Sequence, residues 1–297
     1  MEGIARESAS ALQISPKYNY IPISRREYLN PNILLNSYKL NFSDTNLFLH
    51  HSSYLRTLKK TSVKNGKVHI FITHFDENDP LIEEDWQLLN KVDKFITQNK
   101  STFSYLQSMG IPKDKITIGY GAIDKNLYYP ELVISKLKLN QVLIVGDCKP
   151  RKRADLLEKL IDAMPNVNFI IHGSNWNHFS DLGIKTRKNL LVLPFLLKNN
   201  PKLMRESTIL LSVSELEGGP FPVLEALASG TPVVATDTGF CSELLNSKNG
   251  VLLSQKPTLN EIIESVKSGM LLKKKIFNKN ILEKDLTWIN LAKKLYL

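Results

Sequence analysis

One segment of the sequence, residues 208–236, constrains the fold of this chain more than any other part. Residues 208–213 are apolar and rich in β-branched side chains, which favours a buried strand of a parallel sheet. A Gly-Gly-Pro turn follows at 218–220, and Leu224 and Leu227 then stand three positions apart, as the apolar face of a helix requires. This order of strand, glycine turn and helix predicts an α/β fold with the turn at the carboxyl end of the strand.

Two carboxylates, Glu217 and Glu225, flank this turn and are separated by seven residues. In such a unit the backbone N–H groups and the positive end of the helix dipole stabilise an anion such as a pyrophosphate. Glu217 would face whatever is attached beyond the phosphates, and Glu225 can accept hydrogen bonds from a sugar diol. A glutamate near a helix start also has a purely structural explanation, because it favours the dipole. The serine, glycines and prolines around the pair favour the binding interpretation.

The rest of the chain alternates strands with helices. Six short apolar runs in the second half are typical of parallel strands: 141–146, 167–171, 190–193, 208–213, 232–236 and 250–253. The first half has four such runs, at 47–49, 68–73, 95–97 and 116–118, with helices near 80–90 and 100–109. The pattern predicts doubly wound parallel sheets.

The glycine turn and its glutamates also carry a resemblance to a known family. Residues 214–235 are similar to the paired-glutamate signature of retaining glycosyltransferases of the glycosyltransferase family 4 type, which have the two-domain GT-B architecture. Shorter matches follow the family's order along the chain, at 92–97, 106–111, 115–118, 121–124, 143–146, 151–152 and 286–288. The resemblance covers residues 66–297, and the glutamate pair is its most specific part.

The resemblance implies an α/β protein with two doubly wound, Rossmann-like domains facing a cleft. Residues 1–130 would form the N-terminal, acceptor-side domain, and residues 131–297 the C-terminal domain that binds a nucleotide sugar. We expect the hinge between 124 and 139, and we expect the last helix, 286–297, to pack back on the first domain.

The start of the chain departs from the family. Residues 3–7 look like the family's first glycine loop, in which Gly3 would bind substrate, yet only two residues precede them. We therefore expect the first domain to lack its first strand. Two alternatives stay open: residues 18–23 fill the strand position, or 3–7 belong to an ordinary surface helix.

Basic residues would complete the donor site. The loop at 147–153 carries four of them, and parallel topology brings this loop to the same sheet edge as the glycine turn. Lys152 aligns with the family's phosphate-binding lysine. Where the family has an arginine after the strand glycine this chain has Asp147, so Lys149 or Arg151 would supply the second phosphate contact. The structural alternative is a solvated basic loop.

The resemblance also implies roles for individual residues. Glu217 would be a catalytic residue that orients the hydroxyls of the transferring sugar, and Glu225 would bind the ribose. His74 is the second catalytic candidate, because the family's histidine at this place faces the donor sugar; a hydrogen-bonded structural histidine is the alternative. The residues expected to bind substrate are Gly3, Arg151, Lys152, Ser214, Gly218, Gly219, Pro220, Phe221 and Glu225.

Charge and composition narrow the class of partner. The net charge of +10 suits phosphate-bearing small molecules, nucleic acid or an anionic membrane surface. The sequence has no helix-turn-helix or finger spacing and no basic stripe interleaved with aromatic residues, so we expect no nucleic-acid partner. Lysines 273–275 would form a solvated helix end or attract anionic lipid. Without a run of the ~20 apolar residues that a membrane span needs, we expect a cytoplasmic protein, at most peripheral at the inner membrane face.

Metal and cofactor signals are weak. The chain has no Asp-x-Asp, the carboxylate pair with which other glycosyltransferases hold a divalent ion, and its two cysteines, Cys148 and Cys241, lie far apart. We expect no metal and no cofactor apart from the nucleotide diphosphate sugar itself.

The resemblance, together with these observations, implies a retaining, metal-independent hexosyltransferase. It would move a sugar from a nucleotide diphosphate sugar to a hydroxyl acceptor, a glycan or lipid-linked sugar, in surface polysaccharide or glycolipid biosynthesis. The alternatives are a truncated, non-catalytic relative that binds nucleotide sugar, and an epimerase or phosphorylase of GT-B architecture.

Overall fold

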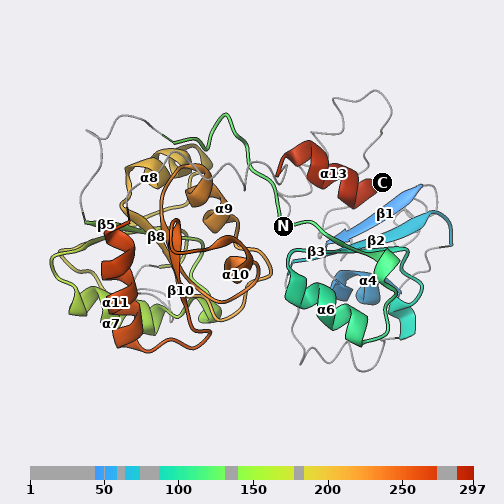
Figure 1. Ribbon diagram of the computed structural model, residues 1–297, viewed down its shortest axis with the longest axis horizontal. Helices are drawn as coiled ribbons and strands as arrows, with labels where there is room; N and C mark the ends of the chain where they lie inside the picture. The colour runs from blue at the N-terminus through green and yellow to red at the C-terminus, as the bar shows by residue number, and fades with distance from the viewer. Residues whose placement is uncertain are drawn as a thin grey trace. The chain divides into compact units, whose positions relative to one another are not determined.

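The computed structural model describes residues 44–49, 51–58, 64–73, 87–130, 140–176, 184–272 and 286–297 of the 297-residue chain. These residues form two compact units (Figure 1). Unit 1 holds the described residues up to Gly121 together with Thr287–Leu297, and unit 2 runs from Ala122 to Leu286. Each unit is built around one parallel sheet.

The sheet of unit 1 has four parallel strands in the order β1-β2-β3-β4. The strands are β1 Thr45–Leu49, β2 Lys67–Ile72, β3 Lys94–Thr97 and β4 Ile116–Ile118. The helices are α4 His51–Leu58, α6 Lys100–Ser108, the 3₁₀ helix η1 Lys113–Lys115, and α13 Trp288–Tyr296. Figure 1 shows α13 on one side of the sheet and α4 and α6 on the other. Ile70, Ile72 and Phe95 are buried with Leu55 and Leu106 in the core.

Helix α13 is fastened to this sheet by polar and apolar contacts. Its N-cap Thr287 accepts a hydrogen bond from the backbone of Asn290, which satisfies one of the helix's free N–H groups. At its other end, the buried His69 donates from Nδ1 to the carbonyl of Leu295 at 2.8 Å, and Lys294 Nζ donates to the carbonyl of Ile118 at 3.0 Å. Burial lowers the pKa of His69, so the imidazole is held neutral against the helix end.

The sheet of unit 2 has six parallel strands in the order β10-β9-β8-β5-β6-β7. The strands are β5 Gln141–Val145, β6 Asn168–His172, β7 Leu190–Leu193, β8 Ile209–Ser212, β9 Val233–Thr236 and β10 Gly250–Leu253. The helices are η3 Pro150–Lys152, α7 Ala154–Ala163, η4 Leu197–Asn199, α8 Asn200–Glu206, α9 Phe221–Ala228, α10 Cys241–Leu244 and α11 Leu259–Met270. The chain runs outward from β5 to β7 and then returns to the other side of β5, so the order reverses between β5 and β8.

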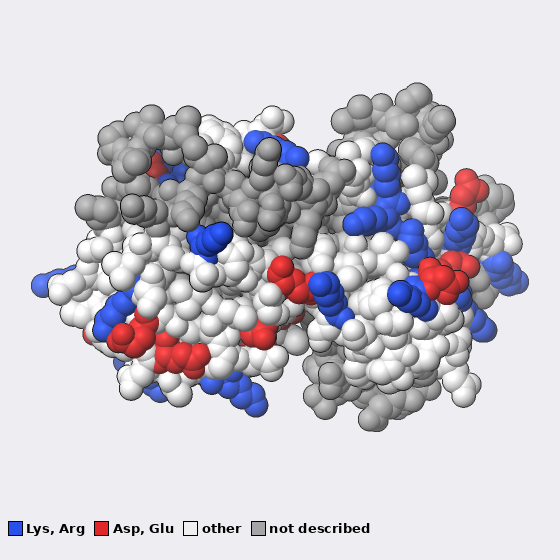
Figure 2. Space-filling view, viewed as in Figure 1, with Lys and Arg blue, Asp and Glu red and all other residues white. Residues whose placement is uncertain are grey.

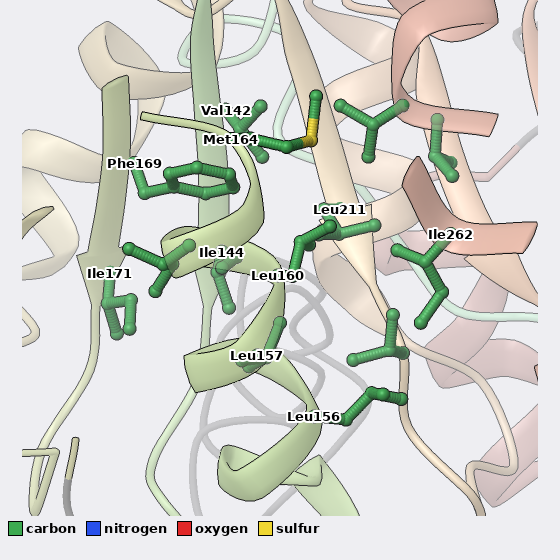
Figure 3. Close-up of a cluster of buried hydrophobic side chains, with 14 of the residues drawn as sticks. Val142, Ile144, Leu156, Leu157, Leu160, Met164, Phe169, Ile171, Leu211 and Ile262 are labelled. Atoms are coloured by element: carbon green, nitrogen blue, oxygen red, sulfur yellow. The ribbon is translucent and has the colours of Figure 1, made fainter. Parts of the chain in front are cut away.

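The core of unit 2 forms where α7 packs on the strands. In Figure 3 Leu156, Leu157 and Leu160 project from α7 toward the sheet, where they meet side chains such as Val142 and Phe169. The leucines recur at helical spacing, and all of these side chains are buried. Burial of each side chain stabilises the fold by about 1.5–3 kcal/mol, which holds the carboxyl ends of the strands in fixed positions.

The predicted fold class is confirmed: both halves are parallel α/β sheets, and each of the ten described strands overlaps a predicted one. Of the helix predicted near 80–90, only 87–90 are described. Three expected features lie outside the described residues: the first glycine loop at 3–7, the alternative strand at 18–23 and the lysines at 273–275. The missing first strand therefore stays a prediction.

The surface carries charges of both signs. On the face drawn in Figure 2, the Lys and Arg side chains lie among Asp and Glu side chains where the surface is not grey. No helix in the described part of the chain is long and apolar enough to cross a membrane.

Candidate functional site

The topology of unit 2 brings two loops together at one edge of its sheet. Strands β5 and β8 are paired neighbours, with Val142 opposite Ile209, so the loops after them leave the sheet side by side. The strand order reverses at this pair, and ligands of open α/β sheets bind at such a switch point. We call residues 149–153, after β5, the basic loop, and residues 214–220, after β8, the glutamate turn.

The backbone fixes the basic loop against the glutamate turn. The N–H of Glu215 donates to the carbonyl of Arg151 at 2.9 Å, which joins the two loops directly. The basic loop forms the short helix η3 and then turns into α7 at Arg153, whose left-handed backbone has a φ of 56°. An L residue in this conformation costs about 1–2 kcal/mol, so the turn is held by its surroundings. Arg153 Nε also lies 3.4 Å from a carboxylate oxygen of Glu215.

Two cations of the basic loop hold Glu217. Lys152 Nζ lies 2.8 Å from Glu217 Oε1, and Arg151 Nη1 donates to the same oxygen and to the carbonyl of Leu216. The side chains of Lys152 and Glu217 are only 14% and 12% exposed, so water screens this charge cluster weakly. Burial alone would raise the pKa of Glu217, but the charges and hydrogen bonds of the two cations hold its pKa below the usual range. Glu217 is therefore ionised.

The glutamate turn is shaped by a close backbone approach. Gly239, after β9, has a φ of +59°, and a Cβ on it would lie 2.5 Å from the carbonyl oxygen of Gly218. The hydroxyl of Thr236 also donates to the carbonyl of Ser214 at 2.6 Å. The Ser214 hydroxyl itself is buried and has no hydrogen-bond partner within the described part of the chain. It borders a small cavity that Lys152 and Ser212 also line.

Helix α9 begins directly after the glutamate turn. Pro220 is its N-cap and supplies no side-chain hydrogen bond, and Pro222 stands in the first turn, where a missing N–H costs nothing. The helix therefore presents its positive end toward the same sheet edge as Lys152 and Arg151. An anion at this edge would meet two cations and a helix N-terminus.

Glu225 lies in a different environment, one turn further along α9. Asn200 Nδ2 donates to Glu225 Oε2 at 2.8 Å, and the Tyr128 hydroxyl donates to the same carboxylate. Burial raises the pKa of Glu225 to about 7, although both hydrogen bonds act in the opposite direction. The two glutamates of one motif thus differ: Glu217 is held by cations and Glu225 by neutral donors.

The structure brings most of the sequence-predicted residues together. Arg151, Lys152 and Glu217 are in contact. Ser214, Gly218, Gly219, Pro220, Phe221 and Glu225 follow one another through the glutamate turn and α9. Gly3 and His74 lie outside the described residues. Asp147 accepts a hydrogen bond from the backbone of Ser174. Of the two candidates for the second phosphate contact, Lys149 is exposed, whereas Arg151 contacts Glu217.

Sequence reasoning missed three residues around Glu225: Tyr128, Asn200 and His172. Tyr128 lies in the segment that follows Gly121, Asn200 begins α8, and His172 ends β6. The three residues are far apart in the sequence, so no local pattern joins them. One signal was present, since His172 ends a predicted strand at the carboxyl edge where ligands bind.

Comparison with known proteins identifies the family and the fold of this chain. The family model described as glycosyl transferases group 1 matches residues 133–284, more than half of the chain and nearly all of unit 2. The chain belongs to this family. The alpha-galactosylglucosyldiacylglycerol synthase of Streptococcus pneumoniae (strain ATCC BAA-255 / R6) is 23% identical over an alignment of 197 residues, and the match covers 59% of this chain. The match spans about half, 52%, of that relative's length.

Solved structures resemble this glycosyl transferases group 1 chain in fold. Anabaena Alr3699/HepE in complex with UDP-glucose has a TM-score of 0.69 at 15% identity, covering 92% of this chain and 82% of its own. The sucrose-phosphate synthase of Thermosynechococcus elongatus has a TM-score of 0.67 at 15% identity, and the match covers 94% of this chain and 79% of that protein. The lipopolysaccharide outer core galactosyltransferase WaaB has a TM-score of 0.61 at 17% identity, and the match covers 88% of this chain and 77% of that protein. These likenesses show a GT-B fold.

Proposed function

We propose that this chain is a retaining glycosyltransferase of the glycosyltransferase family 4 type, a hexosyltransferase that uses a nucleotide diphosphate sugar. The observation that carries the proposal is the ion cluster of Glu217 with Lys152 and Arg151 at the switch point of the second sheet. Membership of the glycosyl transferases group 1 family supports it. The C-terminal domain, 131–297, would bind the donor, and the N-terminal domain, 1–130, the acceptor.

Binding of the donor would exchange one anion for another. The diphosphate takes the place of Glu217 as the partner of Lys152 and Arg151, and the start of α9 donates backbone hydrogen bonds to it. The cations need no reorganisation, because Glu217 already holds them where the phosphates bind. Glu217, released from the cations, then accepts hydrogen bonds from the hydroxyls of the sugar, while Glu225 accepts them from the ribose.

The transfer itself would need no cofactor. The acceptor oxygen bonds to the anomeric carbon from the face that the diphosphate leaves, and the bond to the diphosphate oxygen breaks. The acceptor's proton passes to the leaving diphosphate, whose charge Lys152 and Arg151 stabilise. We also propose that His74 lies near the transferring sugar and that no metal is needed. Among the described residues, no three His, Cys, Asp or Glu side chains gather as a set of metal ligands.

The relatives suggest which substrates to test first. HepE was crystallised with UDP-glucose, and the streptococcal relative is a glycolipid synthase. We therefore propose a uridine diphosphate hexose as donor and a lipid-linked or glycan hydroxyl as acceptor, with a cytoplasmic protein that contacts the membrane peripherally. A relative that binds nucleotide sugar without transferring the sugar is the alternative.

A screen of nucleotide sugars tests the proposal. The full chain is incubated with each sugar, with and without lipid and glycan acceptors and with and without chelator, and nucleotide release is measured. The product's anomeric configuration is then read by NMR. We expect acceptor-dependent release that survives chelator and a product with the donor's configuration. Binding without release would indicate the non-catalytic alternative, and an inverted product would contradict the retaining mechanism.

A further inference from the structure

The carboxylate of Glu225 sits at the end of a buried chain of hydrogen bonds. Asn200 is 1% exposed, and its Nδ2 donates both to Glu225 Oε2 at 2.8 Å and to the Tyr128 hydroxyl at 3.0 Å. On its other side, Asn200 Oδ1 lies 3.2 Å from Nδ1 of the fully buried His172. Four side chains from separate parts of unit 2, Glu225 among them, are therefore joined in one hydrogen-bonded cluster.

The direction of these bonds is set by the backbone. The N–H of Leu196 donates to His172 Nε2 at 3.0 Å, so this nitrogen is the acceptor and the ring proton is on Nδ1. Nδ1–H must then donate to Asn200 Oδ1, which turns the amide so that Nδ2 points to Glu225. The ring of His172 is held further by stacking on Phe195, with ring centroids 4.9 Å apart. The orientation of Asn200 is thus fixed before any ligand arrives.

Tyr128 is held in place independently of Glu225. It lies in a turn in which its backbone N–H donates to the carbonyl of Asp124 at 2.9 Å. Arg205 of α8 fastens the same turn, since it donates to the carbonyl of Leu127 at 2.8 Å and lies 4.5 Å from the ring centroid of Tyr129. Tyr128 is 5% exposed. Its hydroxyl therefore contacts Glu225 from a turn that other residues hold in place.

We propose that Asn200 and Tyr128 are positioning residues for Glu225, which hold its carboxylate so that its free lone pairs accept both hydroxyls of a nucleotide's ribose. An ionised carboxylate has about four acceptor positions, and these two donors fill two of them. The remaining two match the paired hydroxyls of a cis-diol. This inference rests on the proposed function, which makes Glu225 the ribose ligand.

The network also sets the pH at which the carboxylate can act. Burial raises the pKa of Glu225 to about 7, and the hydrogen bond from Tyr128 lowers it, so loss of the Tyr128 hydroxyl raises the pKa further. Among the described residues, the titratable groups around Glu225 are Tyr128 and, beyond its two donors, His172 and Asp124. Donor affinity should therefore increase as the pH rises through the pKa of Glu225.

The test compares Tyr128→Phe with a matched control, Tyr129→Phe. The control removes the hydroxyl of the neighbouring, exposed tyrosine, keeps the ring on which Arg205 stacks, and removes no donor to Glu225. Two quantities are measured: the pKa of Glu225 in the ligand-free protein by carbon-13 NMR, and the KM for the donor and kcat across pH. We expect Tyr128→Phe to raise the pKa, to raise the donor KM about tenfold near neutral pH, and to change kcat less than about twofold. Tyr129→Phe should change none of them.

The outcomes separate this inference from the function on which it rests. If the wild-type protein transfers sugar and Tyr128→Phe matches it in pKa and KM, or if Tyr129→Phe reproduces the effect, the positioning role is wrong and the function stands. If the wild-type protein binds no nucleotide sugar, the proposed function fails and the positioning role fails with it, even where the NMR shift is found.

Discussion

Among single residues, Glu217 and Glu225 belong to one motif, yet their surroundings shift their pKa values in opposite directions. Cations lower the pKa of Glu217, whereas burial raises that of Glu225 to about 7. Sequence reasoning found both carboxylates, because the glycine turn and the spacing are local. It could not assign the two electrostatic states, because Asn200 and Tyr128 reach Glu225 from distant parts of the chain.

The raised pKa of Glu225 predicts a pH-dependent stability. Between pH 4.5 and about pH 7 the folded protein keeps a proton that the unfolded chain releases, so the free energy of unfolding falls as the pH rises through this window. In Glu225→Gln this fall should be absent, and at higher pH the variant should be more stable by up to about 3 kcal/mol. Urea unfolding at about pH 5 and about pH 8 measures this. An identical pH dependence in both proteins would contradict the raised pKa.

The two glutamates should also differ in kinetics. Glu225→Ala would remove the proposed contact to the ribose, which is made in both the ground state and the transition state. It should therefore raise the donor KM about 10- to 150-fold, which corresponds to about 1.5–3 kcal/mol. Glu217→Ala would remove the group that we propose orients the reacting sugar, and it should mainly lower kcat. Steady-state kinetics with the donor found in the screen decides the matter. Small and equal effects would mean that the pair is only structural.

At the scale of elements, the alternation of apolar runs was sufficient to place the strands. Each described strand is a short run of apolar, β-branched residues, and both its burial and its pairing follow from that composition. The strand order of the second sheet was not readable in the same way, because it depends on which side of β5 the chain returns. The contact between the loops after β8 and β9 was also hidden, since it depends on a glycine without a local signature.

The close approach of Gly239 to the carbonyl of Gly218 predicts the effect of adding a methyl group at position 239. In Gly239→Ala the new Cβ would press on the carbonyl of Gly218, so the glutamate turn must move and Glu217 with it. Gly110→Ala is the matched control, because Gly110 also has a positive φ, +89°, but open space around its Cβ position. Both variants should lose about 1–2 kcal/mol of stability from the backbone. Only Gly239→Ala should lose nucleotide binding; equal binding by both, measured by titration calorimetry, would contradict the packing.

For the molecule as a whole, the described residues of the proposed donor site all lie in unit 2. Unit 1 has its own sheet and core, and its expected contributions, Gly3 and His74, lie outside the described residues. The GT-B fold supplies the switch point, and the residues that surround it would supply the chemistry. We therefore expect the edge of the second sheet to bind a nucleoside diphosphate through Lys152 and Arg151.

Calorimetric titration of the full chain with UDP in the presence of chelator tests this claim most directly. Lys152→Ala is compared with Lys159→Ala, which removes an equal charge from an exposed position on α7. We predict saturable binding by the wild-type protein, about tenfold or greater weakening with a smaller salt dependence in Lys152→Ala, and unchanged binding in Lys159→Ala. No saturable binding of UDP or of any other nucleoside diphosphate by the wild-type protein, or equal affinity of the two variants, would contradict the account.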